Sequence, residues 1–153
     1  MSIRVLFVCH GNICRSPMAE FLFRRMVEQA GLSRQIQAAS AATSTEEIGN
    51  PVYPPVRRLL AKHGISTEGK TAVQLRRQDY DRYDWIVAMD TENLWGIRRI
   101  LGGDPAHKVF RLLELSDRPR DIADPWYTGD FQQTYDDLME GCALLLDKVR
   151  KDL

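Results

Sequence analysis

Apolar residues along this chain occur in short runs that alternate with longer stripes of helical period. The short runs, rich in branched and aromatic residues, predict buried strands near residues 3–9, 35–39, 85–89 and 108–112. Elsewhere apolar residues recur every three or four positions, which predicts helices near residues 17–30, 54–63, 91–101 and 131–151. Strands that alternate with helices are typical of α/β proteins. We therefore expect residues 1–153 to form a single three-layer domain, with a four-stranded parallel sheet covered by helices on both faces.

The junction between the first strand and the first helix is clearly marked. Proline is tolerated in the first turn of a helix, and serine is a common N-cap, so Ser16 and Pro17 predict a helix start. Ligands of parallel sheets bind beyond the carboxyl ends of strands, where Cys9 and Asp90 both fall. Two long polar stretches, 42–53 and 116–128, are expected to form the walls of such a site.

The loop after the first strand has the composition of an anion-binding site. Backbone amides at a helix start bind anions, and Gly11 and Asn12 give the loop the freedom to turn them inward. Arg15 adds a planar guanidinium that binds two oxygens of a tetrahedral anion at once. The same positive field stabilises the thiolate form of Cys9. The pattern therefore predicts a thiolate nucleophile inside a phosphate cradle.

This loop, VCHGNICRSP at residues 8–17, resembles the active-site loop of the low-molecular-weight protein tyrosine phosphatases. Other segments similar to the family follow in order along nearly the whole chain: SAATS at 40–44, EIGNP at 47–51, KHGI at 62–65, MD at 89–90 and DPWY at 124–127. An isolated Cys and Arg six positions apart would be a weak signal, whereas this ordered set is specific.

The resemblance implies a phosphotyrosine protein phosphatase I-like fold and hydrolysis of aryl phosphate monoesters. Cys9 would attack phosphorus to form a phosphocysteine, Arg15 would bind the phosphoryl group, and Asp124 would act as general acid and then as general base. The phosphate-binding residues that it implies are His10, Gly11, Asn12, Ile13, Cys14 and Arg15. A phenol has a pKa of about 10, so proton donation to the leaving group is worth roughly 10² to 10⁴ in rate.

The resemblance also implies supporting residues around the loop. Ser16 would donate a hydrogen bond to the Cys9 thiolate. A polar network would hold the loop in shape, and its members would be Asn12, Ser40 and His63. The substrate rim is expected to contain Trp126 and Tyr127 on one wall and Glu46 on the other.

Several of these residues also have a purely structural interpretation. Asp124 precedes a proline and could cap a turn, and Asp90, just before Thr91, is favoured as a helix cap. His63 falls on the apolar stripe of the second helix, where a core histidine with satisfied hydrogen bonds is common. Trp126 and its neighbour could pack on the core instead of lining a rim.

The three cysteines have different expected roles. Cys14 shares the loop with Cys9, and a reversible disulfide between them could protect the nucleophile from over-oxidation; the alternative is a small loop residue without a redox role. Cys142 lies on the apolar stripe of the last helix and is expected to pack there. So few cysteines without a secretory signal favour the reducing cytoplasm.

Two positions bear on substrate choice. Many family members have an aromatic residue where this chain has Glu46, so an aromatic contact is lost and acidic phosphopeptides are disfavoured. Relatives that dephosphorylate phosphoarginine carry threonine at the position of Ile13, and a bulky apolar side chain suits a flat aryl ester better. Phosphotyrosine is therefore the first choice and phosphoarginine the runner-up.

Other classes fit the sequence less well. A phosphocysteine carrier or phosphate-binding module would need no general acid at Asp124. Arsenate reductases of the thioredoxin-coupled type need a further cysteine pair, and this chain has no cysteine between Cys14 and Cys142. A metal site built on Cys9, His10, Cys14 and His63 lacks the usual two-residue ligand spacing. We expect neither a metal nor a cofactor.

Charge and hydropathy narrow the partners. The 21 basic and 21 acidic residues give a formal charge of zero, so there is no general attraction to nucleic acid. No apolar run is long enough to span a bilayer. We expect a cytoplasmic monomer that acts on phosphotyrosine-containing proteins or peptides and releases inorganic phosphate.

Overall fold

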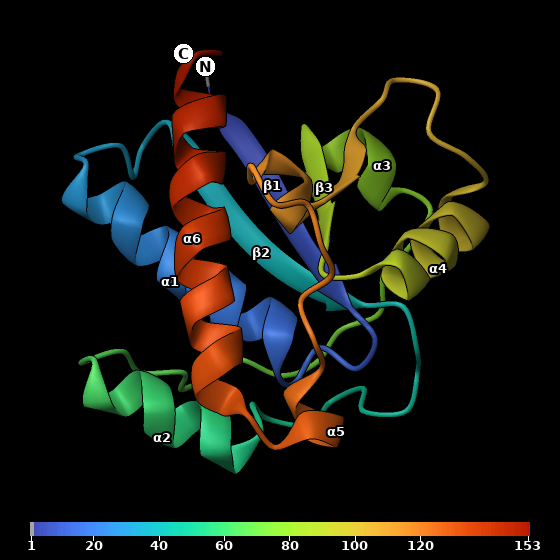
Figure 1. Ribbon diagram of the computed structural model, residues 1–153. Coiled ribbons are helices and arrows are strands. Elements are labelled where there is room, and N and C mark those ends of the chain that lie inside the picture. Colours follow the sequence, from blue (N-terminus) through green and yellow to red (C-terminus); the bar gives the residue numbers. More distant parts are fainter. Residues whose placement is uncertain (1) are drawn as a thin grey trace.

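The computed structural model describes residues 2–153 and contains a four-stranded parallel sheet in the order β2-β1-β3-β4 (Figure 1). The strands are β1 (Ile3–Cys9), β2 (Ile36–Ala42), β3 (Trp85–Ala88) and β4 (Val109–Arg111). The strand order reverses between β1 and β3, so the carboxyl ends of these two strands flank the crevice where such sheets bind ligands.

Helices connect and cover the strands. They are α1 (Arg15–Gln29), α2 (Pro54–Lys62), α3 (Asp79–Arg82), α4 (Thr91–Leu101), the 3-10 helix η1 (Leu112–Leu115), α5 (Pro125–Thr128) and α6 (Phe131–Arg150). The apolar pattern does not predict α3, η1 or α5, because four residues are too few to show a period. Among the helices of residues 2–153, none combines the length and the apolarity that a membrane crossing requires.

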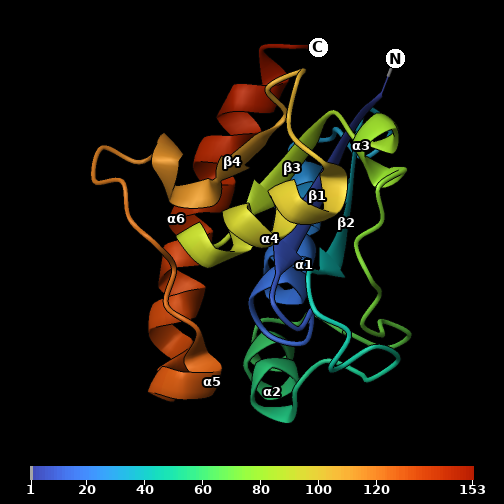
Figure 2. The ribbon, with the colours of Figure 1, turned by 90° about the vertical axis from the view of Figure 1, so that its right-hand side faces the viewer.

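The two faces of β1 belong to different cores. Val5 and Phe7 pack in a large cluster with buried residues of α1 and α6, whereas Leu6 and Val8 pack in a second cluster with Ile97 of α4. Figures 1 and 2 accordingly show α1 and α6 on one side of the sheet and α3 and α4 on the other. The alternation along β1 explains why the strand is apolar on both faces. The predicted three-layer α/β fold is confirmed.

The boundaries differ from the predictions at two places near the crevice. Strand β2 runs to Ala42, three residues beyond its predicted end at 39. Helix α1 starts at Arg15 with Cys14 as its N-cap, and no side chain caps it, so the predicted N-cap role of Ser16 is wrong. Ser16 lies inside the first turn, and its hydroxyl contacts the Cys9 sulfur instead of capping the helix.

Candidate active site

The loop from β1 to α1 curls around the sulfur of Cys9. Cys9 is the last residue of β1 and is only 3% exposed. Asn12 adopts φ 59°, a left-handed conformation that asparagine tolerates better than most residues. Its N–H thereby reaches the Cys9 sulfur at 3.3 Å, while its Oδ1 accepts a hydrogen bond from the Val73 N–H at 3.1 Å. The sequence-predicted cradle is therefore a real turn of backbone around the thiol.

The hydrogen bonds beside Cys9 have a definite direction. Asn12 Nδ2 donates to Ser16 Oγ at 2.7 Å and to Ser40 Oγ at 2.9 Å, which uses both of its protons. Each hydroxyl therefore directs its own proton elsewhere. Ser40 donates to Glu20 Oε1 at 2.6 Å, and Ser16 is left to donate to the Cys9 sulfur at 3.0 Å. The Cys9 sulfur thus accepts hydrogen bonds from both the Ser16 hydroxyl and the Asn12 N–H.

Glu20 anchors the far end of this chain of bonds. Its side chain is 4% exposed and pairs with Arg24 at 2.8 Å and with Lys70 at 3.8 Å. Lys70 also donates to the Ser40 carbonyl at 3.0 Å, and burial lowers its pKa. Sequence reasoning does not identify Glu20 as a member of the network, since Glu20 and Arg24 at i,i+4 look like an ion pair on a solvated helix face. No sequence signal places Lys70 beside them.

His63 does not belong to this network. It is an exposed residue at the C-cap of α2, and its ring stacks on Tyr135 with centroids 4.6 Å apart. The expected network of Asn12, Ser40 and His63 is therefore wrong in its third member, and so is the alternative of a core histidine. The apolar stripe of α2 ends before position 63, because the helix ends at Lys62.

Two short hydrogen bonds from one guanidinium nitrogen fix the position of Arg15. Its Nη1 donates to Asp90 Oδ2 at 2.6 Å and to the Ile122 carbonyl at 2.8 Å. Burial alone would lower the pKa of Arg15, but the charges of Cys9 and Asp90 outweigh burial and raise it. Asp90 also N-caps α4 by accepting from the Asn93 N–H, so its predicted cap role is confirmed and a second role is added.

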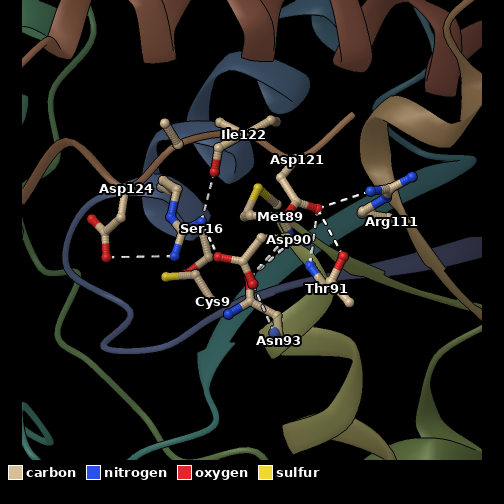
Figure 3. Close-up of polar contacts among 12 residues, drawn as sticks. Cys9, Ser16, Met89, Asp90, Thr91, Asn93, Arg111, Asp121, Ile122 and Asp124 are labelled. Atoms are coloured by element: carbon tan, nitrogen blue, oxygen red, sulfur yellow. Dashed lines mark hydrogen bonds and ion pairs between the residues drawn. The ribbon is translucent and has the colours of Figure 1, made fainter. Parts of the chain in front are cut away.

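Asp124 faces the same guanidinium from the opposite wall. It N-caps α5, where its Oδ1 accepts from the Trp126 N–H at 3.1 Å, and its Oδ2 lies 3.5 Å from Arg15 Nη2. The cap interpretation is thus correct, and the carboxylate reaches the site as well. Figure 3 shows Asp124 and Asp90 on opposite sides of Cys9 and Ser16.

A cleft of about 110 Å³ opens above the loop. Its lining residues are Cys9, His10, Gly11, Ile13, Cys14, Arg15, Glu46, Glu47, Asp124, Trp126 and Tyr127. Both long polar stretches contribute to the walls, as expected. Trp126 and Tyr127 are 51% and 82% exposed, which places them at the mouth and not in the core, and Trp126 contacts Tyr53 with ring centroids 4.8 Å apart.

Glu46 lines the mouth of the cleft across from Trp126. Its side chain is 71% exposed, and its Oε2 lies 3.4 Å from His10 Nε2. It therefore lies at the cleft, as expected of a rim residue. Its effect on acidic peptides stays a prediction.

The other two cysteines are both buried and free. Burial, followed by the nearby charge of Cys9, raises the pKa of Cys14 to about 12, so Cys14 is a neutral thiol at physiological pH. Cys142 is fully buried on α6 and packs in the large core, as predicted.

The chain is similar to known proteins in both sequence and structure. A family model described as low molecular weight phosphotyrosine protein phosphatase matches residues 4–153. The chain is 41% identical over 152 residues to the low molecular weight protein-tyrosine-phosphatase YfkJ of Bacillus subtilis, covering 98% of this chain and 97% of YfkJ. It is 36% identical over 151 residues to PtpA of Staphylococcus epidermidis, covering 98% and 96% of the two chains.

Solved structures agree with the sequence relatives. The crystal structure of YfkJ superposes with a TM-score of 0.94, covering 99% of this chain and 97% of that chain. The low molecular weight protein tyrosine phosphatase from T. tengcongensis gives a TM-score of 0.86 at 31% identity, covering 96% of this chain and 99% of that one.

Proposed function

Since this chain belongs to the low-molecular-weight protein tyrosine phosphatase family and is a hydrolase of phosphotyrosine proteins, we propose that it works through a phosphocysteine on Cys9. The observation that carries the proposal is the convergence of Ser16 and the Asn12 N–H on one buried sulfur, in a cleft that Arg15 and Asp124 also line. We also infer that the whole chain acts as one phosphatase domain.

In the first step the Cys9 thiolate attacks phosphorus. An S–P bond forms, the bond from phosphorus to the tyrosyl oxygen breaks, and Asp124 gives its proton to the leaving oxygen. Both short bonds of Arg15 use Nη1. Nε and the second proton of Nη2, whose other contact is Asp124 Oδ2 at 3.5 Å, are then in a position to bind phosphoryl oxygens. The loop amides of residues 10–15 bind the remaining oxygens.

In the second step Asp124 takes a proton from a water molecule. The oxygen of this water attacks phosphorus, the S–P bond breaks, and inorganic phosphate leaves with the Cys9 thiolate restored. Ser16 stabilises that thiolate as leaving group through the bond whose direction Asn12 sets.

Removing the acid tests this mechanism. We expect Asp124→Ala to lower kcat for a phosphotyrosine peptide roughly 10² to 10⁴-fold, because the phenolate then leaves unprotonated. Stopped-flow phosphate release measures this directly. A kcat equal to that of the unmodified enzyme would show that the phosphatase mechanism stated here is wrong.

Cys14 is proposed to protect the nucleophile. A peroxide would oxidise the Cys9 thiolate to a sulfenic acid, and attack by the Cys14 sulfur would form the disulfide and release water. The neutral state of Cys14 makes this condensation slow at neutral pH and faster as pH rises. Peptide mass spectrometry after peroxide treatment tests it: a sulfinic Cys9 without any link to Cys14 sinks the idea.

We also propose an oligomeric state and a cellular location for the protein. Because one chain supplies Cys9, Arg15 and Asp124 to the same cleft, we propose that the protein acts as a monomer. The three free cysteines fit a reducing compartment, which supports the cytoplasm as its location.

A further inference from the structure

The segment that carries Asp124 is an irregular stretch, residues 116–124, between η1 and α5. An irregular segment that holds a catalytic acid needs contacts that fix it, since a shift of about 1 Å can cost about 10²-fold in rate. Two neighbouring residues of opposite charge, Arg120 and Asp121, lie just before the acid. Arg120 contacts α6, whereas Asp121 contacts the first residue of α4 and the last residue of β4.

Arg120 ties the segment to α6. Its Nη2 donates to Asp137 Oδ1 at 2.9 Å and to Glu140 Oε1 at 3.0 Å. Glu140 in turn accepts from the Ser116 hydroxyl at 2.5 Å, so the first residue and the middle of the segment contact the same residue of α6. Hydrogen bonds from Ser116 and Arg120 lower the pKa of Glu140, which keeps the pair ionised at neutral pH.

Asp121 ties the segment to the other side. Its Oδ1 accepts from the Thr91 N–H at 3.0 Å, from the Thr91 hydroxyl at 3.0 Å and from Arg111 Nη1 at 2.9 Å, as Figure 3 shows. Thr91 is the first residue of α4 and directly follows Asp90, the carboxylate that holds Arg15. The anchor of Asp121 is therefore one residue away from the phosphoryl-binding machinery.

Ile122 transmits this placement to the site. Its N–H donates to the Met89 carbonyl at 2.9 Å, and its carbonyl accepts from Arg15 Nη1 at 2.8 Å. Only Ala123 then separates it from Asp124. A displacement of the Arg120–Asp121 pair toward α6 or toward α4 would break one of its two anchors, so the pair resists movement in both directions.

We propose that Arg120 and Asp121 are positioning residues, an ionic clip that holds Asp124 at its working distance from Arg15 before substrate binds. The proposal rests on the general-acid role of Asp124. The pair of Arg120 with Asp137 is the more buried one, since the Asp137 side chain is 9% exposed, whereas the pairs of Asp121 with Arg111 and of Arg120 with Glu140 are partly exposed and contribute little to folding stability. The effect of breaking them therefore falls on proton transfer more than on folding.

The leaving group distinguishes positioning from a structural role. We expect Asp121→Asn and Arg120→Gln to lower kcat/KM for phenyl phosphate, whose phenol has a pKa of about 10, at least fivefold more than for p-nitrophenyl phosphate, whose phenol is much more acidic. A structural defect would lower both equally. Arg120→Lys should be less impaired than Arg120→Gln. As a control, Asp136 is an exposed acid on α6 that contacts Gln132, and Asp136→Asn should leave kcat/KM unchanged for both substrates.

A double-mutant cycle with Asp124→Ala completes the test. If the clip acts through Asp124, Asp121→Asn has no further effect once Asp124 is alanine. The clip is overturned if Asp121→Asn slows both substrates equally, slows neither, or lowers the rate by the same factor with and without Asp124. An Asp124→Ala enzyme of full activity would instead overturn the acid itself, and the clip with it.

Discussion

At the scale of single residues, Asn12 does more than shape the loop. Its amide uses both protons on serine hydroxyls and its carbonyl on Val73, so this one side chain sets the proton directions from Glu20 to Cys9. Its left-handed backbone also aims an N–H at the sulfur. Conformation and hydrogen bonding thus make separable contributions at this position.

Two substitutions of Asn12 separate the contribution of backbone conformation from that of hydrogen bonding. We expect Asn12→Ala to lower the free energy of unfolding by about 2 to 4 kcal/mol, from buried hydrogen bonds lost and from alanine in a left-handed conformation. Asn12→Gly keeps the conformation without penalty and should lose about 1 kcal/mol less. Urea unfolding at pH 7 measures both. Equal losses in the two variants would contradict a strained backbone at this position.

At the scale of elements, the position of α6 depends on a glycine. A Cβ on Gly141 would lie 2.5 Å from Leu112 Cγ, and Leu112 is fully buried in η1. The helix therefore approaches η1 closely at the point where the segment that carries Asp124 begins. Close approach here brings Glu140 within reach of Ser116 and Arg120.

Gly141→Ala should destabilise the protein even though alanine favours helices. Helix propensity gives back about 1 kcal/mol, whereas overpacking against Leu112 costs about 1 to 3 kcal/mol, so we expect a net loss of about 1 kcal/mol. The exposed Ala143→Gly on the same helix measures the propensity alone. A Gly141→Ala protein with a raised midpoint of thermal unfolding would show that η1 moves freely.

At the scale of the whole molecule, the layers and the catalytic loop could be predicted, because both depend on local signals. The period of apolar residues in β1 and α6, and the close spacing of Cys9 and Arg15, are visible in the sequence. The contact of Glu20 with Lys70 joins distant segments, and the contact of Asp121 with Arg111 joins an irregular stretch to the end of β4, so no local period marks either of them. The prediction for His63 was wrong for a related reason. The KHGI motif identifies the residue type, but it does not show where α2 ends.

The most direct test of the central assignment offers the purified protein equal concentrations of a phosphotyrosine peptide and a phosphoarginine peptide and follows phosphate release, beside a Cys9→Ser control. We expect rapid release from the phosphotyrosine peptide that disappears in the control, since the proposed nucleophile is the Cys9 thiolate and the apolar Ile13 is predicted to favour a flat aryl ester. Release from the phosphoarginine peptide alone, or undiminished release by Cys9→Ser, would contradict it.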